Sequence, residues 1–179
     1  MTTFSVPGLS DEQGHRLAAV LQQRLAACND LHLTLKHVHW NVVGPNFIAV
    51  HEMLDPQVDL VRMYADAIAE RIATLGGSPN GLMGAHVAER SWDDYSLGRD
   101  TAQAHLAALD LVYTGMVGDH RGAIAAAAEL DPVTEDLLIG QTAELEKFQW
   151  FVRAHLEDRS GHLPTSGDHT EGGAADSVR

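Results

Sequence analysis

Residues 36–76 read KHVHWNVVGPNFIAVHEMLDPQVDLVRMYADAIAERIATLG and carry two long helical patterns separated by a short break. Apolar residues recur every three or four positions on both sides of Gly44-Pro45. This favours one amphipathic helix that ends near the dipeptide and another over about 46–75. Pro56 lies inside the second pattern and removes one helical hydrogen bond. We therefore expect a kink there, or a restart of the helix with Asp55 as its cap.

Five side chains in this stretch are of types that bind transition metals: His39, His51, Asp55, Asp66 and Glu70. His51 and Asp66 lie fifteen residues apart, which corresponds to about 22 Å along a helix. The four residues from His51 onward nevertheless fall within about 100° of one another around the helix axis. One chain cannot bring both ends of this row to a single ion, whereas a two-fold axis that lays two copies antiparallel can. Imidazole nitrogen with carboxylate oxygen suits Fe(II), Mn(II) or Zn(II), of which we expect iron.

The rest of the chain adds two more long helices and no strand pattern. Ser10-Asp11-Glu12-Gln13 has the form of a capping box, so the first helix begins there. Further helices are expected over about 96–129 and 132–158, the latter with Asp131 as cap and proline at its first position. We predict an all-α chain with an N-terminal arm at 1–9, a four-helix bundle at 10–158 that has a short extra helix over about 82–90 in the link between helices two and three, and a flexible C-terminal tail at 159–179.

The charge balance of the 179 residues is strongly acidic, with 25 acidic against 12 basic side chains and a formal net charge of −13. Such a balance attracts cations and repels polyanions, so metal is favoured over nucleic acid as a ligand. The N-terminus lacks a basic start followed by an apolar stretch, and no apolar run reaches the length of a membrane span. We therefore expect a cytoplasmic protein without membrane contact. The single cysteine, Cys28, lies among apolar positions and is expected to be a buried small residue.

The sequence around the five metal-binding residue types resembles the Dps family, the miniferritins of bacteria. The resemblance covers about residues 9–158, and every ligand position of the family pattern is filled. The matching residues are Lys36-His37-Val38-His39-Trp40-Asn41, Gly44, Asn46-Phe47, His51-Glu52-Met53, Asp55, Asp66, Ala69-Glu70-Arg71, Leu75-Gly76 and Lys147-Phe148-Gln149-Trp150-Phe151.

The resemblance implies a ferritin-like fold and a homododecameric shell of tetrahedral 23 symmetry, with ferroxidase centres at the two-fold interfaces. His39 and His51 would come from one subunit and Asp66 and Glu70 from its neighbour, with Asp55 beside the histidines. The resemblance also implies that Fe(II) is oxidised at a di-iron centre, preferentially by hydrogen peroxide, and that the ferric oxide mineral is stored inside the shell. This iron-storage activity would protect DNA from oxidative damage.

Two further assignments are hypotheses that each have an ordinary structural alternative. Trp40 lies next to His39 and could intercept a stray oxidising equivalent, or simply pack at an interface. Four acids at the junction of the third and fourth helices could line a three-fold pore for cation entry, or only favour the dipole of the helix start. These acids are Glu129, Asp131, Glu135 and Asp136.

Three other interpretations compete with this one. A di-iron site within one subunit needs two Glu-x-x-His motifs, and only Glu12 to His15 matches. A zincin needs His-Glu-x-x-His, whereas the motif that starts at His51 ends in aspartate. The alternative function is a DNA-binding, nucleoid-compacting protein in which iron oxidation is secondary. No lysine or arginine precedes Arg16, however, and the residues after Arg159 carry three acids and one base, so we expect weak or absent DNA binding.

Overall fold

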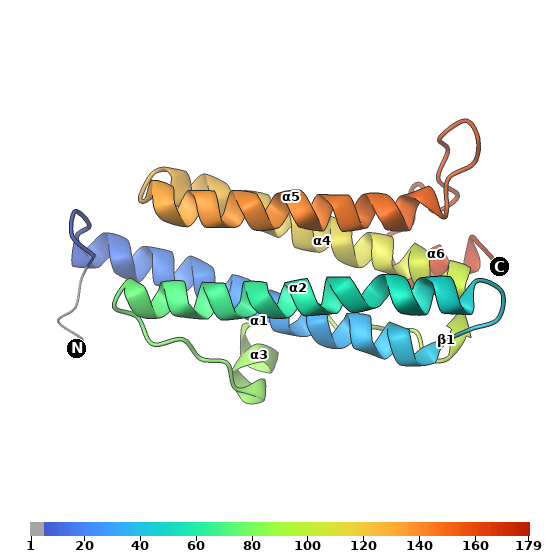
Figure 1. The fold of residues 1–179 in the computed structure, drawn as a ribbon, viewed down its shortest axis with the longest axis horizontal. Helices are drawn as coiled ribbons and strands as arrows, with labels where there is room; N and C mark the ends of the chain where they lie inside the picture. The colour runs from blue at the N-terminus through green and yellow to red at the C-terminus, as the bar shows by residue number, and fades with distance from the viewer. Residues whose placement is uncertain (1–5) are drawn as a thin grey trace.

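Four long helices lie side by side in this computed structural model, which describes residues 6–179 (Figure 1). They form two antiparallel pairs, the first pair joined by a tight turn and the second by another (Figure 1). The predicted all-α architecture with a short helix in the central link is confirmed. The helices are α1 (Asp11–Asn41), α2 (Phe47–Thr74), α3 (Met83–Glu89) in the link, α4 (Ala102–Ala128), α5 (Pro132–Ala154) and α6 (Glu171–Asp176).

The core lies between the four long helices and is built from the apolar stripe of each. On α1 the residues at the predicted spacing, among them Leu17, Leu21, Leu31 and Leu35, are fully or almost fully buried. Cys28 is buried with them, as predicted, and this burial raises the pKa of its thiol to about 12. The thiol therefore stays protonated and acts as a small apolar side chain.

The first helix begins as the sequence predicts. The Ser10 hydroxyl accepts a hydrogen bond from the Gln13 backbone nitrogen at 3.2 Å, and the Gln13 side chain accepts one from the Ser10 backbone nitrogen at 2.9 Å. This reciprocal capping box satisfies two of the free N–H groups at the helix start. Of the predicted arm at 1–9, residues 1–5 lie outside the described part of the chain, and Val6 and Leu9 pack against the core.

The second helix excludes one of the two expectations at Pro56, namely a restart of the helix. α2 runs through Pro56 as a single element, and Asp55 is not a cap. Proline removes only one hydrogen bond from a 28-residue helix, and buried Leu54 and Val58 anchor the helix to the core on both sides of it. Asn46 stands at the cap position in a left-handed conformation with φ 64°, but its side chain makes no capping hydrogen bond. The reach of about 22 Å between His51 and Asp66 therefore applies to a continuous helix.

The start of α4 corrects another expectation. The helix begins at Ala102, with Thr101 as its cap, and not near residue 96. The preceding residues form strand β2 (Asp100–Thr101), which pairs in parallel with strand β1 (Val42–Val43) directly after α1. A ladder of two residues per strand is too short to leave an alternating pattern in the sequence.

The C-terminal segment also differs from the predicted tail. α5 ends at Ala154, four residues earlier than expected, and α6 then packs against α4. The Thr170 hydroxyl caps α6 by accepting a hydrogen bond from the Gly173 backbone nitrogen at 3.1 Å, and Ala174 and Ala175 are buried. A six-residue helix owes its stability to such tertiary contacts, so it has no periodicity that a sequence could reveal.

The start of α5 is confirmed and shows how the second helix pair is fixed to the first. Asp131 caps α5 by accepting hydrogen bonds from the backbone of Val133 and Thr134, and its carboxylate also pairs with Arg71 of α2 at 2.5 Å. Burial opposes ionisation of this carboxyl, but the hydrogen bonds from Thr134 and Arg71 outweigh burial and hold its pKa below the usual value.

We expect Asp131→Ala to lower the free energy of unfolding by about 2 kcal/mol, because it removes a helix cap and the carboxylate that pairs with Arg71. Asp136→Ala is the matched control, because Asp136 is an exposed aspartate near the start of the same helix and is not its cap. Guanidinium unfolding of both variants measures the effect. Equal stability of the two variants would contradict this role for Asp131.

Among residues 6–179, no helix is long and apolar enough to cross a lipid bilayer.

Candidate metal centre

The end of α1 and the start of α2 bring His39 and His51 face to face. Their rings stack with centroids 3.6 Å apart and an angle of 24° between the planes. His39 Nδ1 lies 3.0 Å from the carbonyl oxygen of His51, and His51 Nδ1 lies 2.9 Å from the carbonyl oxygen of His39. Because a carbonyl can only accept, each Nδ1 carries the proton and donates it. Each Nε2 therefore keeps its lone pair, which is the form in which histidine binds a metal.

Asp55 lies next to His39. Its carboxylate oxygen is 3.3 Å from His39 Nδ1 and accepts a hydrogen bond from Lys36 Nζ at 3.0 Å. The hydrogen bond from Lys36 holds the pKa of Asp55 below its usual value, with a further contribution from the nearby histidines. Asp55 thus faces the protonated nitrogen of His39, where a carboxylate orients the ring. Ligation of a metal by Asp55, which the resemblance implies, stays a prediction.

Asp66 and Glu70 lie far along α2 from the histidines and are exposed. In the described residues no group of three or more histidine, cysteine or acidic side chains is close enough to hold a metal ion. One chain therefore brings the two histidines and Asp55 together and leaves the two remaining carboxylates apart from them. Asp66 borders a hollow that His32 and Arg62 also line.

Two neighbours of the centre have no pattern that would have identified them. Lys36 precedes His39 by three residues and so shares its helix face, but only the structure shows that it pairs with Asp55. His32 comes close to Asp66 because α1 packs against α2. Partial burial, together with nearby Arg62 and Lys36, lowers the pKa of His32.

Three large apolar side chains near the histidines in the sequence are exposed. Trp40 is 70% exposed, and the Phe47 ring lies 5.1 Å from the His51 ring. Ile48, next in the chain, is also exposed. Large apolar side chains grouped on a surface usually mark a contact with another molecule. The histidine pair, with His39 buried and His51 half-buried, thus lies close to a surface that suits contact with another molecule.

The four acids suggested for a pore differ in how far their side chains are exposed to solvent. Asp131 is only 4% exposed, caps α5 and forms an ion pair with Arg71. Its carboxylate does not point freely into solvent, contrary to the expectation for a pore-lining group. Glu129 and Asp136 are exposed and Glu135 is half-buried, so these three still offer carboxylates at this end of the bundle.

Known proteins resemble this chain along nearly its whole length. A family model described as a ferritin-like domain matches residues 18–160. The DNA protection during starvation protein of Mycolicibacterium smegmatis is 64% identical over 179 residues, which cover 100% of this chain and 98% of that protein. The solved structure of Mycobacterium smegmatis Dps, 64% identical, matches with a TM-score of 0.93 over 95% of this chain and 97% of that one. DpsA14 from Streptomyces coelicolor, 65% identical, gives 0.89 over 90% and 96%.

The bundle with its short helix in the central link and these matches together define a ferritin-like protein. Within that class the chain belongs to the Dps family, which confirms the resemblance found in its sequence. Membership supports iron storage and protection of DNA as the general function of the chain.

Proposed function

We propose that this protein oxidises Fe(II), preferentially with hydrogen peroxide, at centres shared by two subunits, and stores the ferric product inside a dodecameric shell of 23 symmetry. The observation that carries the proposal is the stacked pair of His39 and His51 with both Nε2 lone pairs free, near one end of α2. Asp66 and Glu70 lie exposed toward the other end. Two α2 helices laid antiparallel by a two-fold axis would bring the carboxylates of one copy to the histidines of the other.

The residue types fit the reaction. The two imidazoles supply nitrogen ligands to Fe(II), the substrate, and the carboxylates supply oxygen ligands that stabilise the ferric product. Two Fe(II) ions release two electrons, which break the O–O bond of one peroxide molecule and yield two hydroxide ions. Because both electrons come from one centre, no hydroxyl radical is released. The charge of −13 per chain attracts Fe(II) to the protein.

Anaerobic loading with Fe(II), followed by stepwise peroxide, tests this function. We expect absorbance from ferric iron to stop rising at about one peroxide per two Fe(II), as the electron balance requires. Light scattering on the same sample should give a particle of about 233 kDa, since twelve chains of 19.4 kDa form the shell. One peroxide consumed per Fe(II), with hydroxyl radical captured by a spin trap, would contradict the proposal.

Trp40 is proposed as a trap for a stray oxidising equivalent, because it is exposed and directly follows His39. Trp40→Phe should leave the rate of Fe(II) oxidation unchanged and remove a tryptophan radical signal from the electron paramagnetic resonance spectrum after peroxide. A radical signal that is the same in the variant would remove this role.

A pore for Fe(II) entry is proposed at the junction of α4 and α5, lined by Glu129, Glu135 and Asp136. Three copies around an axis would focus a negative potential on incoming cations. Asp136→Asn should slow iron uptake in stopped-flow measurements without changing the particle mass. An unchanged uptake rate would remove the assignment.

DNA binding is expected to be weak or absent. After Arg159 the chain has three acids, Asp168, Glu171 and Asp176, and its one base, Arg179, is paired with Asp100 and Asp176. Residues 160–179 therefore offer no unpaired lysine or arginine to phosphates. Gel shift of the intact protein with duplex DNA at about 0.1 M salt should show no retention.

A variant with a lysine-rich extension at the N-terminus is the control for this assay, because added cations should restore retention. Tight, salt-sensitive retention of DNA by the unmodified protein would overturn the expectation.

A further inference from the structure

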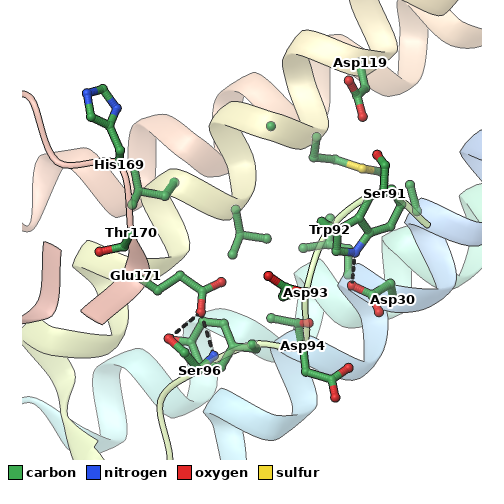
Figure 2. A pocket seen from close by; sticks show the side chains of 18 of the residues that line it. Asp30, Ser91, Trp92, Asp93, Asp94, Ser96, Asp119, His169, Thr170 and Glu171 are labelled. Atoms are coloured by element: carbon green, nitrogen blue, oxygen red, sulfur yellow. Dashed lines mark hydrogen bonds between the residues drawn. The ribbon is translucent and has the colours of Figure 1, made fainter. Parts of the chain in front are cut away.

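A cavity of about 650 Å³ lies away from the candidate metal centre, and none of the five proposed ligand residues lines it. It is open to solvent on one side and is lined by α1, α4, the extended segment 91–96 and the C-terminal residues 169–172 (Figure 2). Its volume falls within the range of about 300–1,000 Å³ that is typical of small-molecule sites.

The walls of the cavity are held in place by contacts between distant parts of the chain. Figure 2 shows Glu171 reaching from the C-terminal segment to Ser96, whose backbone nitrogen and hydroxyl both donate to its carboxylate at 2.6 and 2.7 Å. On the opposite wall the Trp92 indole nitrogen donates to Asp30 at 2.8 Å. The cavity therefore exists because the C-terminal segment folds back along α4, and it is formed before any ligand enters.

The lining is rich in negative charge. It contains five carboxylates and no lysine or arginine: Asp30, Asp93, Asp94, Asp119 and Glu171. Arg90 pairs with Asp30 and Asp94, and Arg24 pairs with Asp119, from outside the lining. Among the described residues neither Asp93 nor Glu171 forms an ion pair, and Glu171 accepts its hydrogen bonds from Ser96. Burial is the main cause that raises the pKa of Tyr95, and the charges of Glu171 and Asp100 raise it further.

The other part of the lining is apolar and aromatic, with Trp92, Tyr95, Leu111 and Met116. A bare metal ion would need three or more converging ligands, and residues 6–179 contain no such group. Carboxylates without an ion pair, next to aromatic rings, suit an organic cation. Its charged group would lie against the carboxylates, and its apolar part would pack on the aromatic and aliphatic wall.

We propose that this cavity binds an organic ammonium ion with an aromatic or alkyl body. The ammonium group lies between Glu171 and Asp93, and the body packs on Trp92 and Met116. The site is separate from iron oxidation and does not depend on it.

Titration calorimetry of the full-length protein with phenethylamine tests the charge requirement. We expect saturable binding of one molecule per chain, and about tenfold weaker binding of 2-phenylethanol, which has the same size without the charge. Glu171→Gln should weaken phenethylamine binding about tenfold. Glu157→Gln, an exposed acid outside the cavity, is the matched control and should change nothing.

A second pair of variants tests the location. Gly115 lines the cavity, and an added Cβ there meets no atom within 4 Å, so Gly115→Leu should fill the cavity without disturbing the fold. Gly118 lies on the same helix with equal free space but does not line the cavity. Gly115→Leu should abolish binding and Gly118→Leu should retain it.

Three results would overturn the proposal: no saturable heat with phenethylamine, equal binding of the uncharged alcohol, or wild-type binding by Gly115→Leu. Stoichiometric binding of Mn²⁺ that requires Glu171, without binding of phenethylamine, would also overturn it. Circular dichroism and particle mass of each variant show that it is folded and assembled. If Gly115→Leu fails that check, the alcohol still decides the outcome, and so does Glu171→Gln, whose unchanged binding of phenethylamine would overturn the proposal.

Discussion

Mixed oligomers of His51→Ala and Asp66→Ala subunits should recover about a quarter of the wild-type rate of Fe(II) oxidation, although each variant alone loses about 100-fold. In a random mixture, about half of the two-fold pairs contain one chain of each kind. One of the two centres in such a pair keeps its histidines from one chain and its carboxylates from the other. A site within one chain would recover nothing. Co-expression of differently tagged variants and stopped-flow absorbance measure the recovery.

A mixture of His51→Ala with His39→Ala is the matched control. Both residues belong to the same half of the centre, so every pair has a damaged histidine side in both centres. This mixture should stay at the rate of its parents. Recovery in the control, or no recovery in the first mixture despite wild-type particle mass, would contradict a centre shared between subunits.

Acidification from pH 6.5 to pH 4 should remove about 3 kcal/mol of stability through His120 alone. This side chain is 0% exposed, and burial, with repulsion from Arg24, lowers its pKa to about 4. Between pH 4 and 6.5 the unfolded chain binds the proton and the folded chain does not. Stability from this group is therefore fully present above pH 6.5 and is lost as the pH falls toward 4.

His120→Leu should flatten the pH dependence of the unfolding free energy by this amount, because leucine cannot be protonated. Guanidinium unfolding at pH 7 and pH 4 measures the difference between variant and wild type at each pH. His162→Asn, which removes an exposed histidine from the C-terminal segment, is the control. If His120→Leu and wild type lose stability in parallel on acidification, His120 is not the responsible group.

The architecture could be predicted because it depends on periodicity and local chemistry. The Ser10 capping box, the Asp131-Pro132 start and the break at Gly44 are local signals, and the structure confirms each. The separation of His51 and Asp66 also follows from helical rise alone. His120 could have been found in the same way, since it shares a buried face of α4 with Tyr113 and Met116 at helical spacing.

Other features depend on contacts between distant residues and could not be predicted. The hydrogen bonds that leave each Nε2 free join two histidines across a turn and depend on how their rings are rotated. In the sequence Asp131 cannot be told from other acids that begin helices. Only the packing of α2 against α5 shows that it forms an ion pair with Arg71. The segment after Arg159 has turn-like composition, yet buried alanines hold α6 on α4.

The two-residue ladder of β1 and β2 connects the end of the chain to the histidine pair. Arg179 pairs with Asp100, Asp100 faces Val42 in the ladder, and Val42 closes the helix turn that carries His39. Loss of the ion pair between Arg179 and Asp100, by proteolysis or by a bulky fusion, would therefore make the turn between α1 and α2 less rigid. A substitution of Arg179 would therefore alter the packing around His39 and His51.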